Sequence, residues 1–140
     1  MKIRAFLDAD ETAVVALWTH CGLVRPWNDP HKDVARKKQV QRDLFLVAEQ
    51  GGEVVGAVMG GYEGHRGWVN YLAVHESQRR NGLGRALMAE VETRLRALGC
   101  PKINLQVRND NRGAIAFYTR IGFLEDASVS LGKRLQSDEV

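Results

Sequence analysis

The chain has 140 residues and a mass of 15.7 kDa, the size of one domain that can bury an apolar core without metals or disulfides. Its hydrophobic content of 44% and charged content of 26% are those of an ordinary globular protein, and no apolar run approaches the ~20 residues of a membrane span. The net charge is +3, but 17 acidic residues are interspersed with 20 basic ones, which argues against a nucleic-acid-binding face. We therefore expect a single domain over residues 1–140 that binds neither nucleic acid nor membranes.

The N-terminus bears on the cellular compartment, and the spacing of the cysteines bears on metal binding and disulfides. The chain begins Met1-Lys2-Ile3 and lacks the apolar stretch of a signal peptide, so we expect a cytoplasmic protein. The two cysteines, Cys21 and Cys100, lie far apart, and neither belongs to a CxxC pair. This spacing supports neither a disulfide framework nor a zinc site, and no metal is expected.

The first part of the chain predicts a strand, a helix and an irregular segment. Residues 2–6 alternate polar and apolar side chains, and residues 8–21 place their apolar side chains on one helical face. Arg25, Trp27 and Asn28 follow, and they bring a charge, a flat aromatic face and an amide into a short span. This combination is more than a spacer requires, and it predicts contacts with a substrate.

A second helix is predicted from Pro30 to about Asp43, with Asp29 as its N-cap. It is mostly charged and has only a thin apolar stripe of Val34 and Val40, so we expect a surface helix that is weakly held. Such a helix is typical of a mobile cover over a binding cleft and also of a plain surface connection. The chemistry of the preceding segment favours the cover.

Three consecutive antiparallel strands are predicted in the middle of the chain. Apolar runs at residues 44–49 and 54–59 are joined across Gly51 and Gly52, which is a strong hairpin signal. A third apolar run covers residues 68–74. In the rest of the chain, helices are predicted at residues 83–98 and 112–121, and a fifth strand is predicted between them at residues 102–107. A final pair of strands is predicted at residues 123–125 and 128–135. This order of elements argues for one α+β domain.

The loop at residues 79–85 has the composition of an anion site. It lies between a predicted strand and a predicted helix, and it contains Gly82, Gly84 and several arginines. Glycine lets the backbone turn tightly and approach a ligand, and the first N–H groups of the following helix point outward at the positive end of the helix dipole. A pyrophosphate group would bind at such a position.

Two common nucleotide-binding motifs do not match this loop. A P-loop requires Lys and then Ser or Thr after its last glycine, but Arg85 and Ala86 follow here. A dinucleotide-binding fingerprint requires Gly or Ala where Leu87 stands. The remaining pattern is Arg-x-x-Gly-x-Gly.

Together with a second motif, this pattern resembles the GCN5-related N-acetyltransferases (GNAT), and the resemblance covers nearly the whole chain. The loop motif is carried by Arg79, Gly82 and Gly84, and the second motif runs from Asn111 through Phe117-Tyr118 to Gly122-Phe123. Taken alone, Phe117 and Tyr118 would be read as ordinary half-buried aromatic residues. The resemblance implies a GNAT fold, which is a mixed, mostly antiparallel sheet of six to seven strands flanked by four helices, with a splay between the fourth and fifth strands.

The resemblance also implies acetyl-coenzyme A as the cosubstrate. The exposed backbone of the fourth strand would pair with the pantetheine arm, and a backbone N–H near Val74 would polarise the thioester oxygen. The loop would bind the pyrophosphate, and Asn111 matches a residue that contacts the cofactor, although a capping role explains it equally well. The implied cofactor-binding residues are Leu72, Ala73, Val74, Arg79, Arg80, Asn81, Gly82, Gly84, Arg85, Asn111 and Tyr118.

Tyr118 matches the general acid of the family, placed to protonate the departing thiolate. The general base is not evident, because Asn70 and Tyr71 stand where many members of the family offer a Glu on the fourth strand. Glu63 is the candidate, acting through water, and His65 is the second choice, while a solvated turn explains both residues equally well. An α-amine with a pKa of ~7.7–8.0 needs little help, so the missing base favours such an acceptor or a water relay.

We therefore predict an N-acetyltransferase that acts on a primary amine of a small molecule or peptide by direct attack in a ternary complex. Homodimers are common in the family, but the sequence identifies no interface. The alternative is a coenzyme A-binding sensor without significant turnover, which the missing base would suit. The candidate acceptor-binding residues are Arg25, Trp27, Asn28, Tyr62 and Tyr71.

Overall fold

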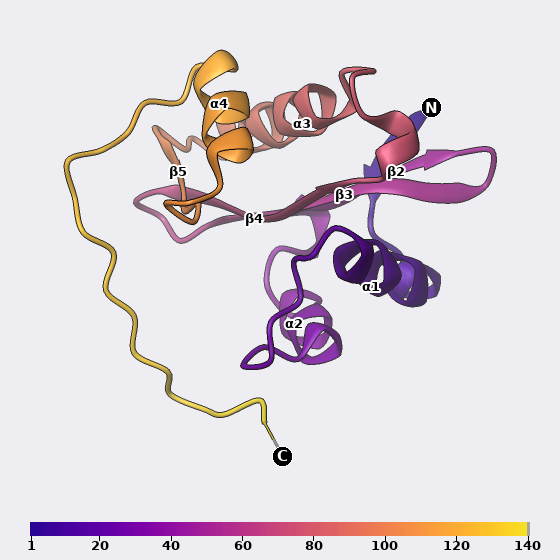
Figure 1. Ribbon diagram of the computed structural model, residues 1–140, viewed down its shortest axis with the longest axis horizontal. Helices are drawn as coiled ribbons and strands as arrows, with labels where there is room; N and C mark the ends of the chain where they lie inside the picture. Colours follow the sequence, from indigo (N-terminus) through magenta and orange to yellow (C-terminus); the bar gives the residue numbers. More distant parts are fainter. Residues whose placement is uncertain (140) are drawn as a thin grey trace.

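The computed structural model describes residues 1–139, which form one central sheet with helices on both faces. Helices α3 and α4 cover one face, and helices α1 and α2 cover the other (Figure 1). The helices are α1 (Glu11–His20), α2 (Pro30–Lys37), α3 (Leu83–Ala97) and α4 (Arg112–Arg120). The strands are β1 (Lys2–Ala5), β2 (Phe45–Gln50), β3 (Glu53–Tyr62), β4 (Gly67–Val74) and β5 (Ile103–Leu105).

The strands lie in the order β1-β2-β3-β4-β5. The first four pair antiparallel with their neighbours, and β5 joins β4 in parallel. The parallel pair requires a crossover, which α3 supplies between the two strands. The predicted α+β class, the four helices and the mixed, mostly antiparallel sheet are therefore confirmed.

Each face of the sheet carries its own apolar core. In β2, Leu46 and Ala48 belong to the cluster that α3 covers, whereas Phe45 and Val47 belong to the cluster that α1 covers. All four side chains are buried, which explains why this strand reads as an unbroken apolar run. The largest buried side chain on the α1 face is Trp18, which stacks on Phe45.

A β-bulge interrupts β4 next to its pairing with β5. Ala57 pairs with Ala73 and Met59 with Asn70, so that one residue of β3 lies opposite two residues of β4, Tyr71 and Leu72. Tyr71 has a φ of 55°, a left-handed conformation that is uncommon for a bulky side chain. The bulge was not predicted.

The pairing between β4 and β5 extends only over Gly67, Trp68 and Val69. Strand β5 ends at Leu105, whereas β4 continues to Val74. The second half of β4 therefore has a strand partner on its β3 side alone. This arrangement confirms the predicted splay between the fourth and fifth strands.

The final pair of strands is absent, so the sheet has five strands instead of six to seven. Residues 123–125 and 128–135 have no strand assignment, and Leu124, Val129 and Leu131 are 85–91% exposed. A strand also needs a neighbouring strand for its backbone groups, and within residues 1–139 the one backbone–backbone hydrogen bond of these residues runs from Phe123 N to Tyr118 O, at the end of α4.

Helix α2 ends at Lys37, earlier than the predicted end near Asp43. Gln41 adopts a left-handed conformation with a φ of 51°, and its side-chain amide pairs with the backbone of Tyr62 in both directions, at 2.7 and 2.9 Å. This contact with β3 diverts the chain from the helix. Val34 is fully buried while Val40 is 59% exposed, so the apolar stripe is shorter than the sequence suggested.

Candidate active site

The open edge of β4 provides free backbone groups. The N–H of His75 donates to Val55 O at 2.8 Å across β3, and successive residues of a strand direct their peptide groups to opposite edges. The N–H and C=O of Val74 therefore face away from β3, on the side where β5 has ended. The Sγ of Cys21, at the end of α1, lies 3.5 Å from Val74 O. Val74 O therefore already accepts a hydrogen bond from this thiol, and the Val74 N–H is the group left for an extended ligand.

The loop after β4 leads directly into the N-terminus of α3. Gly82 is the N-cap with a φ of 77°, and Arg80 is also left-handed with a φ of 71°. The first intrahelical bond runs from Ala86 N to Gly82 O, so the preceding N–H groups of the first turn have no partner in the helix. These groups and the helix dipole form a site suited to a phosphate.

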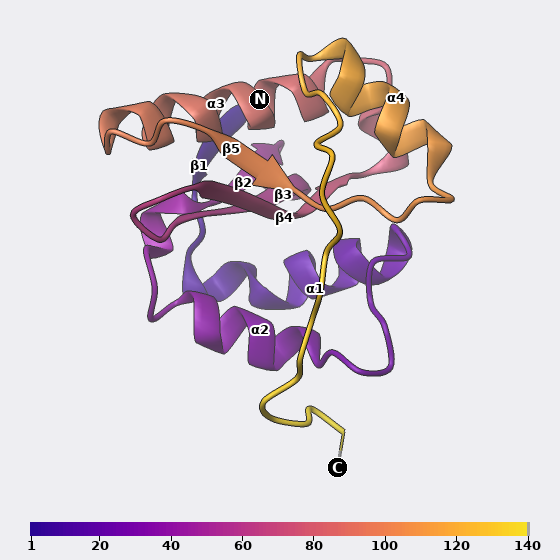
Figure 2. The same cartoon turned by 90° about the vertical axis from the view of Figure 1, so that its left-hand side faces the viewer.

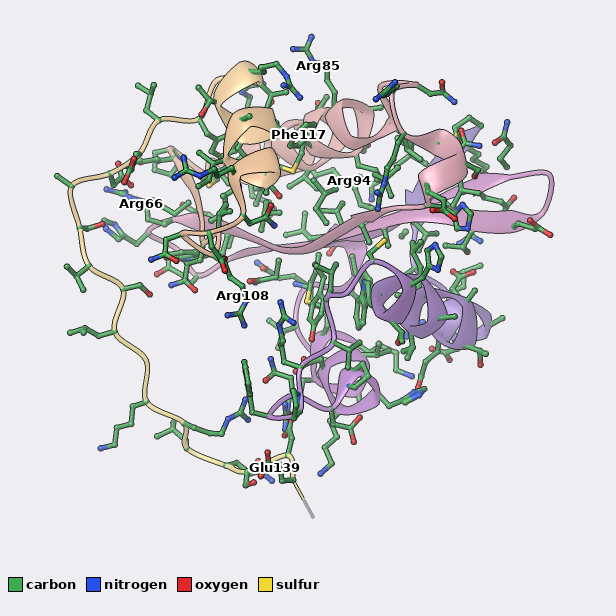
Figure 3. All side chains as sticks on the ribbon, viewed as in Figure 1. Arg66, Arg85, Arg94, Arg108, Phe117 and Glu139 are labelled. Carbon is green, nitrogen blue, oxygen red and sulfur yellow. The ribbon has the colours of Figure 1, made fainter. Side chains whose placement is uncertain are left out.

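Three arginines surround this helix start. Arg79, Arg80 and Arg85 are exposed, and none of them forms an ion pair with a carboxylate of residues 1–139. Figure 3 shows Arg85 projecting outward from α3. Their charge is free for an anionic ligand. Asn81 is also exposed, and its side chain lies 3.5 Å from the Oε1 of Gln78.

The two loop glycines are required for different reasons. Gly82 needs its left-handed backbone, whereas a Cβ on Gly84 would lie 3.2 Å from the ring of Phe117 and 3.7 Å from Val74. Phe117 lies between α4 and α3 (Figure 3). Gly84 thus lets α4 pack closely against the helix start, and this packing joins the two sequence motifs in space.

A hollow of about 450 Å³ lies between α3 and the end of α4. Arg85 and Arg120 both line it, and Arg120 was not predicted as a site residue. Because it adjoins the helix start, this hollow can accept the part of a ligand that extends beyond a bound pyrophosphate.

Tyr118 projects from α4 into the apolar cluster under α3. Its ring packs edge-on against Phe117 and Phe123, with centroid distances of 5.1 and 5.6 Å. Burial raises the pKa of Tyr118 to about 12, because the phenolate would be desolvated. Among the hydrogen bonds of the described chain, none involves the Tyr118 hydroxyl, which is therefore free to donate to a bound group.

Asn111 caps α4. Its Oδ1 accepts a hydrogen bond from Ala114 N at 3.1 Å, which satisfies one N–H of the first turn. The amide nitrogen of Asn111 remains available. The capping role is therefore present, and a contact with the cofactor is compatible with it.

The residues predicted for the acceptor meet an arginine that sequence reasoning missed. The guanidinium of Arg108, in the loop after β5, lies 5.7 Å from the centre of the Trp27 ring, a cation–π contact across the splay. Figure 3 shows Arg108 pointing from the sheet toward the α1–α2 segment. Asn28 accepts a hydrogen bond from Arg134, which comes from the far end of the chain. No local pattern relates these residues.

Tyr71 is engaged on the α1 face of the sheet. Its ring stacks on Trp18 with a centroid distance of 4.0 Å, and its hydroxyl donates to Asp33 Oδ2 of α2 at 2.7 Å. Burial and this carboxylate raise the pKa of Tyr71. The contact ties α2 to the bulge of β4.

Tyr62, Glu63 and His65 lie at the β3–β4 turn, away from the splay. Tyr62 pairs with Gly67, and the three residues from Gly67 to Val69, roughly 10 Å of strand, are still paired with β5. Glu63 is exposed and caps its own turn: its Oε1 accepts from the N–H of His65 at 2.6 Å and from the N–H of Arg66. These hydrogen bonds, first that from Arg66, lower the pKa of Glu63. The structure does not bring Glu63 close to Tyr118.

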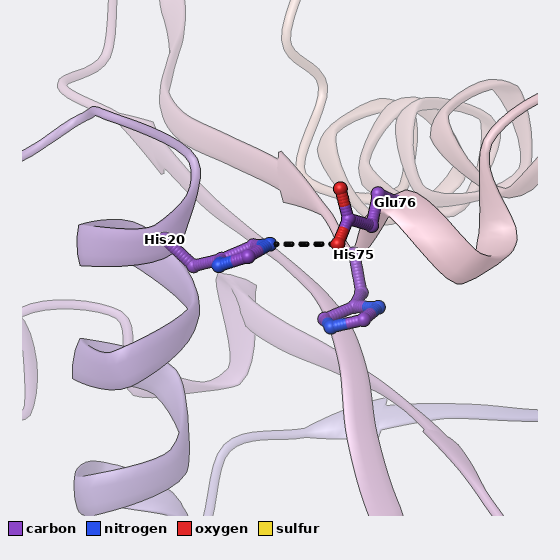
Figure 4. Close-up of side chains that lie close together, drawn as sticks. All are labelled: His20, His75 and Glu76. Carbon is purple, nitrogen blue, oxygen red and sulfur yellow. Dashed lines mark ion pairs between the residues drawn. The ribbon is translucent and has the colours of Figure 1, made fainter.

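The segment between β4 and the loop is tied to α1 by a small polar cluster (Figure 4). His20 Nε2 lies 3.4 Å from Glu76 Oε1, and the rings of His20 and His75 stack with centroids 5.2 Å apart. One nitrogen of each histidine and a carboxylate oxygen of Glu76 lie within 4.8 Å of one another. In the contacts present, His75 Nδ1 is engaged with the Oγ of Ser77 at 2.8 Å, and the cluster fixes the start of the loop.

The split sheet and the free helix start form a surface suited to an extended anionic ligand, and the Tyr118 phenol packs in the apolar cluster under the same helix. The model of the Acetyltransferase (GNAT) family matches residues 7–123, and the chain therefore belongs to this family. It is an N-acetyltransferase, an enzyme of the acyltransferase class.

Relatives and solved structures agree with this assignment. The chain is 50% identical to acetyltransferase SG1711 of Sodalis glossinidius over 140 residues, which cover 99% of each chain. It is also 50% identical to acetyltransferase ECA0875 of Pectobacterium atrosepticum over 138 residues, covering 99% of this chain and 98% of the relative. The structure of Ard1 from Thermoplasma volcanium superposes with a TM-score of 0.81 at 28% identity, covering 90% of this chain and 84% of the other.

A further solved structure is the ribosomal-protein-S18-alanine N-acetyltransferase of Escherichia coli. It has a TM-score of 0.77 at 27% identity and covers 89% of this chain and 78% of that one. Naa20 of Chaetomium thermophilum was solved with a bisubstrate analogue and superposes with a TM-score of 0.70 at 25% identity, covering 87% and 70% of the two chains. In the part of the chain that the structure describes, no helix is both long and apolar enough to cross a membrane.

Proposed function

We propose that this protein transfers an acetyl group from acetyl-coenzyme A to a primary amine by direct attack in a ternary complex. The observation that carries the proposal is the open edge of β4, which is followed in the chain by the loop of residues 75–82 and the free N-terminus of α3. An extended pantetheine arm would pair with the open edge of β4, and a pyrophosphate would bind at the N-terminus of α3. The exposed side chains of Arg79, Arg80 and Arg85 would add charge, and the hollow beside Arg120 would hold the nucleotide end.

The reaction needs three groups in addition to the bound thioester. The neutral amine attacks the thioester carbon, and the negative charge that develops on the oxygen is stabilised by a backbone N–H near Val74, a contact of the type worth ~3–4 kcal/mol in other enzymes. The carbon–sulfur bond then breaks, and Tyr118 donates a hydrogen bond or its proton to the departing thiolate. The attacking nitrogen loses its proton to water.

We assign Tyr118 as the general acid because its hydroxyl has no other partner in the described chain and its pKa of about 12 keeps it protonated. A phenol with this pKa does not transfer its proton fully to a thiolate whose conjugate acid has a pKa of ~8.5. Its contribution is therefore hydrogen bonding to developing charge. This contribution acts on turnover and leaves the binding of the coenzyme largely unchanged.

For the acceptor we propose an amine of low pKa, either a peptide α-amine or a small-molecule amine. Glu63 is committed to its own turn and lies beyond the paired part of β4, so its contribution as a base would be indirect, through water. An α-amine with a pKa of ~7.7–8.0 is substantially neutral at physiological pH and needs no dedicated base. The E. coli enzyme, at 27% identity, is named for acting on an alanine of a ribosomal protein, which supports the peptide class.

A thiol-release assay with acetyl-coenzyme A tests the proposal. The acceptor panel should contain peptides with free N-termini, the same peptides blocked at the N-terminus but carrying a lysine, small amines, polyamines and amino acids. We expect turnover with free α-amines and little with the lysine-only peptides. Turnover restricted to lysine side chains would contradict the low-pKa acceptor, and tight binding of coenzyme A without turnover on any acceptor would contradict the transfer itself.

A further inference from the structure

Two segments that are distant in the sequence meet on the acceptor side of the proposed site, and Trp27 and Arg108 make the contact between them. Trp27 belongs to the segment between α1 and α2, and Arg108 belongs to the loop between β5 and α4. In Figure 2 this loop and this segment lie at the same end of the sheet, with the loop above the segment. The Cζ of Arg108 lies 5.7 Å from the centre of the Trp27 ring. The cation–π contact orients an arginine that is otherwise exposed.

The hydrogen-bond donors of Arg108 are unused within the protein. Among residues 1–139, the Arg108 side chain donates no hydrogen bond and forms no ion pair, not even with Asp110 two residues further on. A guanidinium that lies over an aromatic ring keeps the N–H groups along its edge available, and these match the two oxygens of a carboxylate. Arg108 is therefore suited to bind a carboxylate that comes from outside the chain.

The carboxylates that follow Trp27 in the chain or reach this segment from the C-terminal end are engaged elsewhere. Asp29 accepts hydrogen bonds from two backbone N–H groups of the first turn of α2, at 2.9 and 3.3 Å. Asp33 accepts one from the hydroxyl of Tyr71 at 2.7 Å. The side chain of Asp138 is almost fully buried and pairs with the guanidinium of Arg36. Each of these carboxylates has donors of its own, so none of them neutralises Arg108.

Arg25 adds a second positive charge to the turn that carries the Trp27 ring. Its carbonyl oxygen accepts a hydrogen bond from Asn28 N at 3.0 Å, which closes the turn. The Arg25 side chain is half-buried and forms no ion pair within residues 1–139. Arg134, which also contacts Asn28, differs because it lies 3.9 Å from a carboxylate oxygen of Asp138. In the described chain, Arg25 and Arg108 are thus two cations on the acceptor side that lack a counter-charge.

We propose that the acceptor carries a carboxylate close to its reactive amine and that Arg108 binds this carboxylate, while Arg25 adds to the attraction. The inference rests on the proposed function, because it names the chemical class of the acceptor at the same site. An acidic residue near the N-terminus of a peptide and an acidic group on a small amine offer the same chemistry. Two cations without a counter-charge favour such acceptors and repel polycationic ones. Arg108 is in this way a specificity-determining residue and takes no part in the transfer step.

The first test uses acceptors in matched pairs with the full-length protein. One pair consists of peptides with free N-termini that differ only in Glu or Gln at the second position, and the other consists of glutamic acid α-amide and glutaminamide. We expect kcat/KM to be about tenfold higher for the acidic member of at least one pair, as for a charge-assisted hydrogen bond. The pair that shows the preference identifies a peptide or a small molecule as the source of the carboxylate. Equal kcat/KM values within both pairs would overturn the proposal.

The variants then assign the preference to Arg108. Arg108→Gln should remove most of it by lowering kcat/KM for the acidic member alone, and Arg108→Glu should reverse it in favour of a peptide with Lys at the second position. Arg96→Gln is the matched control, because Arg96 is exposed, has no ion pair in the described chain and lies at the far end of α3. Neither arginine belongs to a core, so circular dichroism should show all variants folded. A preference that survives Arg108→Gln would overturn the proposal.

The second test measures binding without transfer, so that this inference and the proposed function can fail separately. The same acceptors are titrated by calorimetry into protein saturated with coenzyme A, which carries no acetyl group. The acidic acceptor should bind about tenfold more tightly than its neutral partner, and the difference should shrink in high salt and in Arg108→Gln. Such a preference without turnover from acetyl-coenzyme A would refute the transfer and support the carboxylate site. Turnover together with equal affinities for acidic and neutral acceptors would refute the carboxylate site and support the transfer.

Discussion

The two sides of the proposed site are constructed differently. The cofactor side consists of β4, the loop and the first turn of α3, which are contiguous in sequence, and it offers mainly backbone groups. The acceptor side combines residues from the α1–α2 segment, the loop after β5 and the end of the chain, and it offers mainly side chains. A cosubstrate that is the same in every reaction can be bound by backbone groups if the chain has the right conformation. Recognition of a particular acceptor depends on the identity of the side chains that contact it. Substitutions on the two sides should therefore have separable kinetic effects.

We expect the largest loss of turnover from Tyr118→Phe, which lies where the proposed cofactor and acceptor sides join. This substitution removes the hydroxyl that we propose hydrogen-bonds to the departing thiolate, so kcat should fall by roughly 100-fold. The dissociation constant of acetyl-coenzyme A, measured by calorimetry, should stay within about twofold, because the ring and its packing are retained. A variant with natural turnover would remove Tyr118 from the proposed mechanism.

The next effect concerns the cofactor side alone. Arg85→Ala should weaken acetyl-coenzyme A binding by about tenfold, as expected for the loss of one charge-assisted contact, and the difference should shrink in high salt. Arg96→Ala removes a charge from the other end of the same helix and is the matched control. Equal losses in the two variants would mean that net charge, and not the helix start, attracts the ligand.

A smaller effect is expected on the acceptor side. Trp27→Ala removes the ring that Arg108 covers, a contact worth about 0.5–1 kcal/mol at an exposed position, so the KM for the acceptor should rise by about two- to fivefold. The affinity for acetyl-coenzyme A should not change, and Trp27→Phe should restore part of the loss. An effect on coenzyme binding instead would contradict the division into two sides.

The smallest effect is expected for Glu63→Gln. The pKa of Glu63 is lowered in the folded protein, so this carboxylate is ionised throughout the neutral range and contributes no inflection there. Tyr118, with a pKa of about 12, stays protonated over the same range. The rise of kcat/KM with pH should therefore report deprotonation of the acceptor amine and persist in the variant, with kcat within about threefold. Loss of the rising limb in Glu63→Gln would establish Glu63 as the base.

Several features of this protein were determined by the sequence alone, because each depends on neighbouring residues. The hairpin at Gly51-Gly52, the left-handed Gly82 at the start of α3 and the cap at Asn111 all follow from local conformational preference. The apolar periodicities identified the helices and the five strands of the sheet. Both family motifs could be found in this way, since each lies within one short segment.

Only the tertiary structure decided the features that join distant segments. No glycine in the sequence at Tyr71 predicts the bulge there. The conformation is stabilised by stacking of Tyr71 on Trp18 and by the hydrogen bond from its hydroxyl to Asp33. The contact of Trp27 with Arg108 likewise depends on how the elements pack, because neither residue predicts the other. The alternation at residues 128–135 predicts a strand, but whether a strand forms depends on a partner for its backbone. Local preference fixes the conformation of a segment, whereas its partners are chosen by the packing of the whole chain.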